Sequence, residues 1–158
     1  ARAEIAGKPA DVFDPPGGPA GRYALLFLHP VGGESIAGNA AYTDELARHR
    51  LPCVATWGGR SWWVDRVCPE FDPELTAERH LLQNVLPWMV ERWGLGPRGV
   101  AAAGISMGGQ GAVRLGLKYP DRFPVVASVA GAFDFHERWG EGSPLDAMYP
   151  TRERCRLD

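Results

Sequence analysis

The feature that most constrains the fold is a Gly-x-Ser-x-Gly pattern, Gly104-Ile105-Ser106-Met107-Gly108. It follows an apolar run at 99–103 that suits a buried strand, and it precedes a segment at 111–119 that suits a helix. Glycines flank the serine because a strand turning sharply into a helix leaves no room for side chains and needs strained dihedral angles. The pattern therefore predicts that Ser106 lies on a tight strand-to-helix turn.

Apolar runs and helical segments alternate along the rest of the chain. The composition of the runs predicts strands at 22–29, 51–57, 99–105 and 123–130, and helices at 39–50, 72–94 and 108–119. Such alternation is typical of right-handed βαβ crossovers. We therefore expect one α/β domain over residues 1–158, with a mostly parallel sheet and helices on both faces.

Several local predictions accompany this fold. Residues 9–21 are rich in proline and glycine and are expected to form a surface loop. Asp72 is expected to cap the helix that Pro73 begins, and Pro87 is expected to bend that helix or end it early. After Gly131 the periodicity fades, and residues 137–158 read as polar and turn-rich.

Composition excludes several classes of function. The net charge is −2 and no run of lysine or arginine occurs, which argues against a nucleic-acid surface. No apolar stretch approaches the roughly 20 residues that span a bilayer, and no signal peptide is visible. The three cysteines form no metal spacing and no disulfide framework, and Cys53 is expected to be a buried thiol. These observations favour a cytoplasmic protein that binds neither nucleic acid nor membrane.

Ser106 is the candidate nucleophile. A serine hydroxyl is too weakly acidic to attack an acyl carbon quickly, so it needs a neighbouring base. The turn after a central strand would lift the serine oxygen above the carboxyl edge of the sheet, where ligands bind in open α/β folds. The alternative is a glycine-rich turn with a bystander serine, and the surrounding strand and helix favour the nucleophile.

A second glycine-rich turn, at 29–33, follows the strand at 22–29. Backbone N–H groups aimed at a developing oxyanion stabilise acyl transfer strongly. One donor would be Met107 N–H, next to the serine, and the other Val31 N–H or, as the second choice, Gly32 N–H. Pro30 has no N–H to donate. The alternative is a loop that simply connects a strand to a helix.

Further residues are candidates for the substrate pocket because they follow strand ends at the same edge of the sheet.

The sequence offers no convincing general base for Ser106. His136 is the only histidine after Ser106 and lies two residues from Asp134, too early in the fold for the usual triad histidine. His49 and His80 lie in predicted helices and are read as ordinary histidines. The pocket candidates are His29, Trp57, Trp62, Trp63, Asp134 and His136.

Together these motifs resemble the putative-esterase branch of the α/β hydrolases, which includes esterase D (S-formylglutathione hydrolase), feruloyl esterases and mycolyltransferase-like proteins. The elbow at 102–112 looks very like that of the family, and the segments at 28–33, 61–64 and 119–123 are similar to family segments, with Pro30 where glycine is usual. The resemblance covers about residues 22–136. It implies hydrolysis of a carboxylic ester or thioester through an acyl-serine, without a metal or an organic cofactor.

The resemblance also implies an aspartate and a histidine on two strand ends beyond the elbow, and this sequence does not supply them. We therefore expect the chain to be the N-terminal part of the fold, completed by a second polypeptide or by a further segment of a longer chain. The substrate would be a small ester. Two alternatives stay open: an acyltransferase that uses the same serine, and a binding module that keeps the fold without catalysis.

Overall fold

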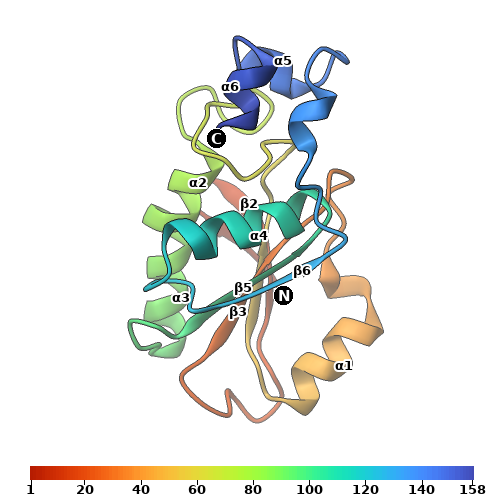
Figure 1. Cartoon of the computed structure of the whole chain (residues 1–158). Coiled ribbons are helices and arrows are strands. Elements are labelled where there is room, and N and C mark those ends of the chain that lie inside the picture. The colour runs from red at the N-terminus through yellow and green to blue at the C-terminus, as the bar shows by residue number, and fades with distance from the viewer.

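The six strands of the protein form one mixed sheet in a computed structural model that describes residues 1–158. The order is β1-β2-β4-β3-β5-β6, in which β4, β3, β5 and β6 run parallel while β1 and β2 are antiparallel (Figure 1). The four parallel strands are those that the sequence predicts. Their bounds are β1 Arg2–Ile5, β2 Lys8–Phe13, β3 Ala24–Leu28, β4 Cys53–Thr56, β5 Val100–Ile105 and β6 Val125–Val129.

Helices cover both faces of the sheet, as predicted. Leu26 and Leu28 of β3 face the larger core, which includes Met89 and Leu115, whereas Phe27 faces a smaller core. Alternate side chains of a strand point to opposite faces, so β3 contributes to both cores. The helical elements are η1 Ile36–Gly38, α1 Ala40–Arg48, α2 Ala77–His80, η2 Leu81–Val85, α3 Leu86–Trp93, α4 Met107–Lys118, η3 Phe135–Arg138, α5 Pro144–Met148 and α6 Arg152–Arg156.

The prediction of a loop over 9–21 is wrong for its first five residues, which belong to β2. Ala10 and Val12 are buried and alternate with more exposed neighbours, and β2 pairs with β4 in the register Ala10↔Thr56. A tight turn at Ala6 and Gly7, both with positive φ, joins β2 to β1. Pro9 and the short strand length conceal this hairpin in the sequence.

The predicted helix start at Asp72 is also wrong. The carboxylate of Asp72 accepts from Glu74 N–H at 2.9 Å and Leu75 N–H at 2.8 Å, and it pairs with Lys8 at 2.8 Å, so it closes a turn. The helix begins at Ala77, after Thr76 caps Arg79 N–H. The helical path does not end at Pro87. The π turn η2 precedes Pro87, and α3 continues past Pro87 to Trp93. Gly94, which follows, adopts the left-handed conformation and ends the helix.

Residues 137–158 form two short helices, α5 and α6, although their sequence is polar and rich in turn residues. α5 and α6 lie together at one end of the molecule (Figure 1). Asp158 pairs with Arg114 of α4 and, at 3.1 Å, with Arg66. Long-range contacts rather than local periodicity fix this segment. Its side chains in the main core are Leu145, Met148, Tyr149 and Cys155.

The strand β6, which forms one of the two edges of the sheet, is exposed along its whole length. All five residues of β6 are exposed, including Val125 at 63% and Val129 at 59%. In addition, no helix has both the length and the apolar character that crossing a bilayer requires.

Candidate active site

Ser106 lies on a strained turn between β5 and α4, as the sequence predicts. Its φ of 53° and ψ of −113° place a non-glycine residue in a region that costs free energy and persists where the surroundings enforce it. Ser106 N–H donates to Val129 C=O at 2.9 Å, and Ser106 C=O accepts from Ala132 N–H at 3.1 Å and Gln110 N–H at 3.0 Å. The backbone is therefore held on three sides, while no hydrogen bond engages the side-chain oxygen.

The flanking glycines are required by close approach of the backbone. A Cβ on Gly104 would stand 2.3 Å from the carbonyl carbon of Gly108, and a Cβ on Gly108 would meet the β3 backbone. Contacts under 3.0 Å force something to move, and here the obstacle is backbone. The Gly-x-Ser-x-Gly spacing thus lets α4 start directly against the sheet.

The N-terminus of α4 begins next to the serine. Met107 is its first residue, and Ser106 makes no side-chain capping bond. The first N–H groups of a helix have no partner within the helix and lie at the positive end of its dipole. This end of α4 therefore presents donors and a favourable potential to an anionic group beside Ser106.

The loop at 29–33 forms a turn in which Gly33 N–H donates to Pro30 C=O at 2.9 Å. Neither Val31 N–H nor Gly32 N–H donates to any protein acceptor in the structure. Val31 lines the same cavity as Ser106, whereas Gly32 does not. Val31, the first choice from the sequence, therefore has a free backbone donor and lines the Ser106 cavity.

His29 holds this loop in place. Its Nδ1 lies 2.7 Å from Pro30 O, and its Nε2 accepts from Gly58 N–H at 2.9 Å. Burial lowers the pKa of His29, and both contacts suit a neutral ring that carries its proton on Nδ1. Trp63 Nε1–H donates to His29 O at 3.3 Å. His29 is thus a structural link between two loops, and it lines a different cavity from the one at Ser106.

The cavity at Ser106 has a volume of about 320 Å³. Of the residues expected from the sequence it brings together three: Ser106, Val31 and Trp62. The remaining walls were not foreseen, because most come from the segment that reads as turn-rich, and no motif marks them. They are Arg60, Ala132, Arg138, Glu141, Gly142, Ser143 and Pro144.

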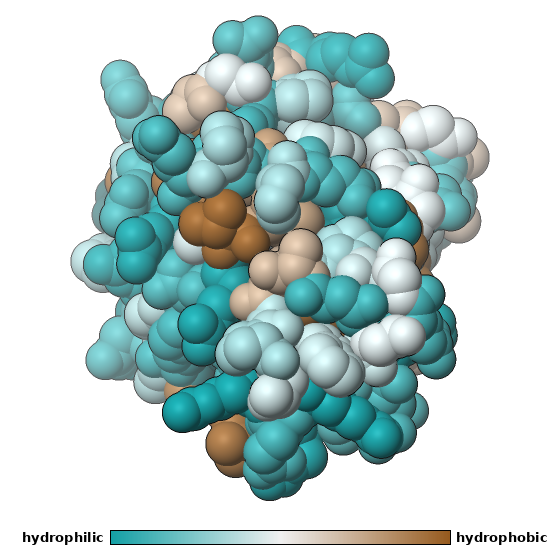
Figure 2. Space-filling model, turned by 90° about the horizontal axis from the view of Figure 1, so that it is seen from above, coloured by the Kyte–Doolittle hydropathy of each residue, from teal (hydrophilic) through white to brown (hydrophobic).

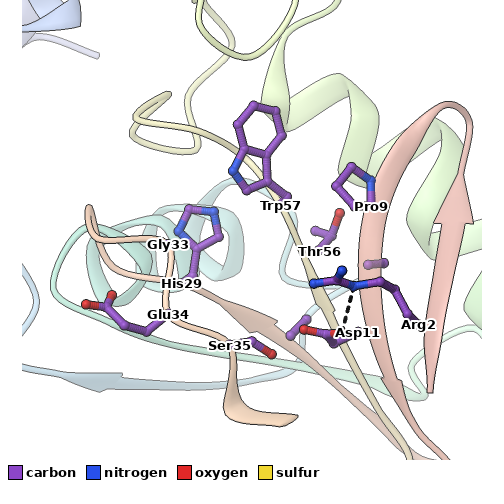
Figure 3. Close-up of a pocket in the computed structure, with 11 residues that line it drawn as sticks. Arg2, Pro9, Asp11, His29, Gly33, Glu34, Ser35, Thr56 and Trp57 are labelled. Atoms are coloured by element: carbon purple, nitrogen blue, oxygen red, sulfur yellow. Dashed lines mark ion pairs between the residues drawn. The ribbon is translucent and has the colours of Figure 1, made fainter. Parts of the chain in front are cut away.

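The three tryptophans expected in the pocket lie in three different environments. Trp62 is the one that lines the Ser106 cavity, and its ring stacks on Phe135 with centroids 5.0 Å apart. Trp63 is fully buried, and its ring fills the space beside Gly58, so its assignment to the pocket is wrong. Trp57 lines another, smaller cavity with His29, next to the Arg2–Asp11 ion pair (Figure 3).

Asp134 and His136 do not reach the Ser106 cavity either. After Asp134 the chain coils into η3, so Phe135 turns inward to Trp62 while His136 Nε2 lies 3.2 Å from Glu137 Oε1. Their assignment to the substrate pocket stays a prediction that this cavity does not support.

The remaining two histidines lie elsewhere. His49 is 69% exposed beside Glu45, whereas His80 is fully buried against Phe71. No histidine of the chain lines the cavity at Ser106. No group of three or more histidine, cysteine or acidic side chains is placed to hold a metal ion.

The end of the molecule that carries α5 and α6 has a largely hydrophilic surface, with a small hydrophobic patch near its middle and another near the lower edge of the view (Figure 2). A serine on a strand-to-helix turn of a largely parallel sheet defines the α/β hydrolase class. Residues 33–155 match the family described as Putative esterase. The chain belongs to this family.

Curated relatives agree with this assignment. The MPT51/MPB51 antigen of Mycobacterium tuberculosis is 37% identical over 100 residues, which cover 60% of this chain and 30% of the antigen. The diacylglycerol acyltransferase/mycolyltransferase Ag85C of Mycobacterium avium is 39% identical over 62 residues, or 39% of this chain and 18% of that protein. The matched segments thus span less than a third of the length of either relative.

Solved structures share the fold. The S-formylglutathione hydrolase of Agrobacterium tumefaciens superposes with a TM-score of 0.69 at 15% identity, covering 94% of this chain and 62% of the hydrolase. The M. tuberculosis MPT51 structure gives a TM-score of 0.63 at 23% identity, covering 89% and 49%. At these identities the likeness concerns the fold alone.

Proposed function

We propose that the protein hydrolyses carboxylic esters or thioesters through an acyl intermediate on Ser106. The observation that carries this proposal is the conformation of Ser106, with its backbone fixed at φ 53° and ψ −113° and its hydroxyl free at a cavity. Strain of this kind persists at functional sites because the surrounding structure over-determines it. If Ser106 had no function, the strained backbone conformation at this position would have no functional reason to persist.

In this mechanism the Ser106 hydroxyl attacks the ester carbonyl while a base takes its proton. The tetrahedral oxyanion accepts hydrogen bonds from Met107 N–H and Val31 N–H, at the positive end of α4. Collapse of the intermediate expels the alcohol or thiol, which receives the proton from the base. A water molecule then repeats the sequence on the acyl-serine and releases the acid.

The general base is proposed to be a histidine outside this sequence, oriented by a carboxylate that is also outside it. None of the four histidines lines the Ser106 cavity, as described above. The open edge of β6 supports the same view, because an exposed apolar edge strand favours pairing with another strand. A second polypeptide, or a further segment of a longer chain, would dock there. Intact-mass measurement of the native protein distinguishes these two sources.

Two other functions remain candidates on specific observations. Acyl transfer to an alcohol uses the same acyl-serine, and the relative Ag85C is named an acyltransferase. A binding module without catalysis fits the absence of a histidine at the cavity. Added acceptor alcohol diverts the acyl group to a new ester only if transfer competes with hydrolysis.

The test is the Ser106→Ala variant, assayed on p-nitrophenyl acetate with the native protein. Turnover should fall by at least about a thousandfold, because the nucleophile is lost. Ser143→Ala, at the other serine of the cavity, is the matched control and should retain turnover. Wild-type activity in Ser106→Ala would refute the proposal, and an inactive native protein would favour the binding module.

A further inference from the structure

Two arginines stand at the mouth of the Ser106 cavity. Arg60 and Arg138 both line it and both are exposed, one after β4 and the other at the end of η3. These two segments lie far apart in the sequence, and both contribute to the lining of the cavity that holds Ser106. The cavity thus combines a nucleophilic serine, an aromatic wall at Trp62 and cationic groups at its rim.

The two guanidinium groups differ in their partners. Arg60 Nε–H donates to Glu70 at 2.8 Å, so its charge is already compensated. Arg138 makes no ion pair, and no hydrogen bond uses its side chain. Glu141 lines the same cavity, yet it forms no ion pair with either arginine. Arg138 is therefore the cation at this site that has no ion-pair partner.

We propose that Arg138 binds a carboxylate on the substrate, so that the preferred esters are monoanionic; this inference rests on the proposed function. A guanidinium presents donors in a planar fork that matches a carboxylate, and such charge-assisted hydrogen bonds are among the stronger ones. The ester group would lie at Ser106 and the carboxylate at the rim. Glu141 would repel a second negative charge and so limit the substrate to one.

The test measures binding without turnover. The full chain carrying Ser106→Ala is titrated with monomethyl glutarate, an ester with one carboxylate, and with dimethyl glutarate, its neutral counterpart. Amide and indole NMR signals of Trp62, Ala132 and Gly142 report on the cavity. The monoanion should bind about tenfold more tightly, as one charge-assisted hydrogen bond predicts, and added salt should reduce this preference.

Variants assign the preference to a residue. Arg138→Gln should abolish it and Arg138→Lys should retain part of it, whereas Glu141→Gln, the matched change at the same rim, should preserve or increase it. Equal binding of the two esters, binding of neither, or a preference that survives Arg138→Gln would overturn the inference. Because this assay needs no turnover, its outcome is independent of whether Ser106 forms an acyl-enzyme.

Discussion

Gly108 lies directly against Leu28: a Cβ on Gly108 would stand 1.9 Å from the carbonyl oxygen of Leu28. This contact joins the first turn of α4 to the end of β3, the strand that leads into the loop carrying Val31. The nucleophile turn and the proposed oxyanion loop are therefore positioned by one backbone-to-backbone contact.

Gly108→Ala should separate these two elements. The added methyl group cannot be accommodated by a side-chain rotation, so the free energy of unfolding should fall by about 2 kcal/mol or more, and ester turnover should be lost. Urea denaturation followed by circular dichroism measures the first effect. Gly96→Ala is the control because a Cβ there meets nothing within 4 Å. Equal stability of the two variants would contradict the packing argument.

Asp146 shapes one wall of the Ser106 cavity. Its carboxylate accepts from Gly140 N–H at 2.6 Å and from Gly142 N–H at 2.9 Å. Asp146→Ala should loosen this loop, raising KM for esters with little change in kcat, and should cost about 1 kcal/mol of stability. Asp134→Ala, an exposed site with no side-chain partner, serves as the comparison. A fall in kcat with unchanged KM would argue against a positioning role.

Glu78 is a buried carboxylate, only 1% exposed, that binds the C-terminal end of α4. Its carboxylate pairs with Arg114, receives Lys118 Nζ at 2.6 Å and accepts from Tyr119 Oη–H at 2.6 Å. Removing one member of a buried ionic cluster leaves uncompensated charge.

Glu78→Ala should therefore destabilise the fold by about 3 kcal/mol, and Glu78→Gln by less. Thermal unfolding checks this order, with the exposed Glu74→Ala as reference. A loss under about 0.5 kcal/mol for Glu78→Ala, the range of ordinary surface changes, would show that the cluster contributes little.

His80 should make stability depend on pH. Burial, together with the positive charge of Lys8, lowers the pKa of His80 to about 4 from 6.5. Between these values the unfolded state binds a proton that the folded state does not. Stability should thus be intact above pH 6.5 and decline as the pH falls, by about 2 kcal/mol at pH 4.5.

Urea unfolding at several pH values measures this decline. His80→Leu should flatten it without removing it, because burial lowers the pKa of His29 in the same direction. His49→Leu, at a 69% exposed site, should leave the decline unchanged. An identical pH dependence in His80→Leu would exclude His80 as its source.

The parts of the site that sequence alone predicts are those with a local cause. The Ser106 turn needs glycines at fixed spacing, and the four parallel strands are continuous apolar runs, so both are visible in the sequence. The segment Asp72-Pro73-Glu74 has the residues that are typical of a helix start, so it hides the capping role of Thr76. In the structure Asp72 instead closes a turn and pairs with Lys8. Local sequence patterns cannot reveal an ion pair between Asp72 and Lys8, which lies 64 residues away.

The cavity walls depend on long-range contacts. Trp62 and Trp63 are adjacent in sequence and both are buried, yet only Trp62 lines the cavity; both have φ 56°, so the backbone turns here rather than continuing as a strand. Arg138 reaches the site because residues 137–158 fold back onto α4, where Asp158 pairs with Arg114 across 44 positions. Neither arrangement leaves a periodic pattern in the sequence.

The most direct test of the account is whether Ser106 forms a covalent adduct. The native protein, with any polypeptide that accompanies it, is treated with a fluorophosphonate, and the modified peptide is identified by mass spectrometry. The account predicts one adduct per chain, on Ser106, and none in Ser106→Ala. An unmodified native protein, or an adduct on another residue, would contradict it.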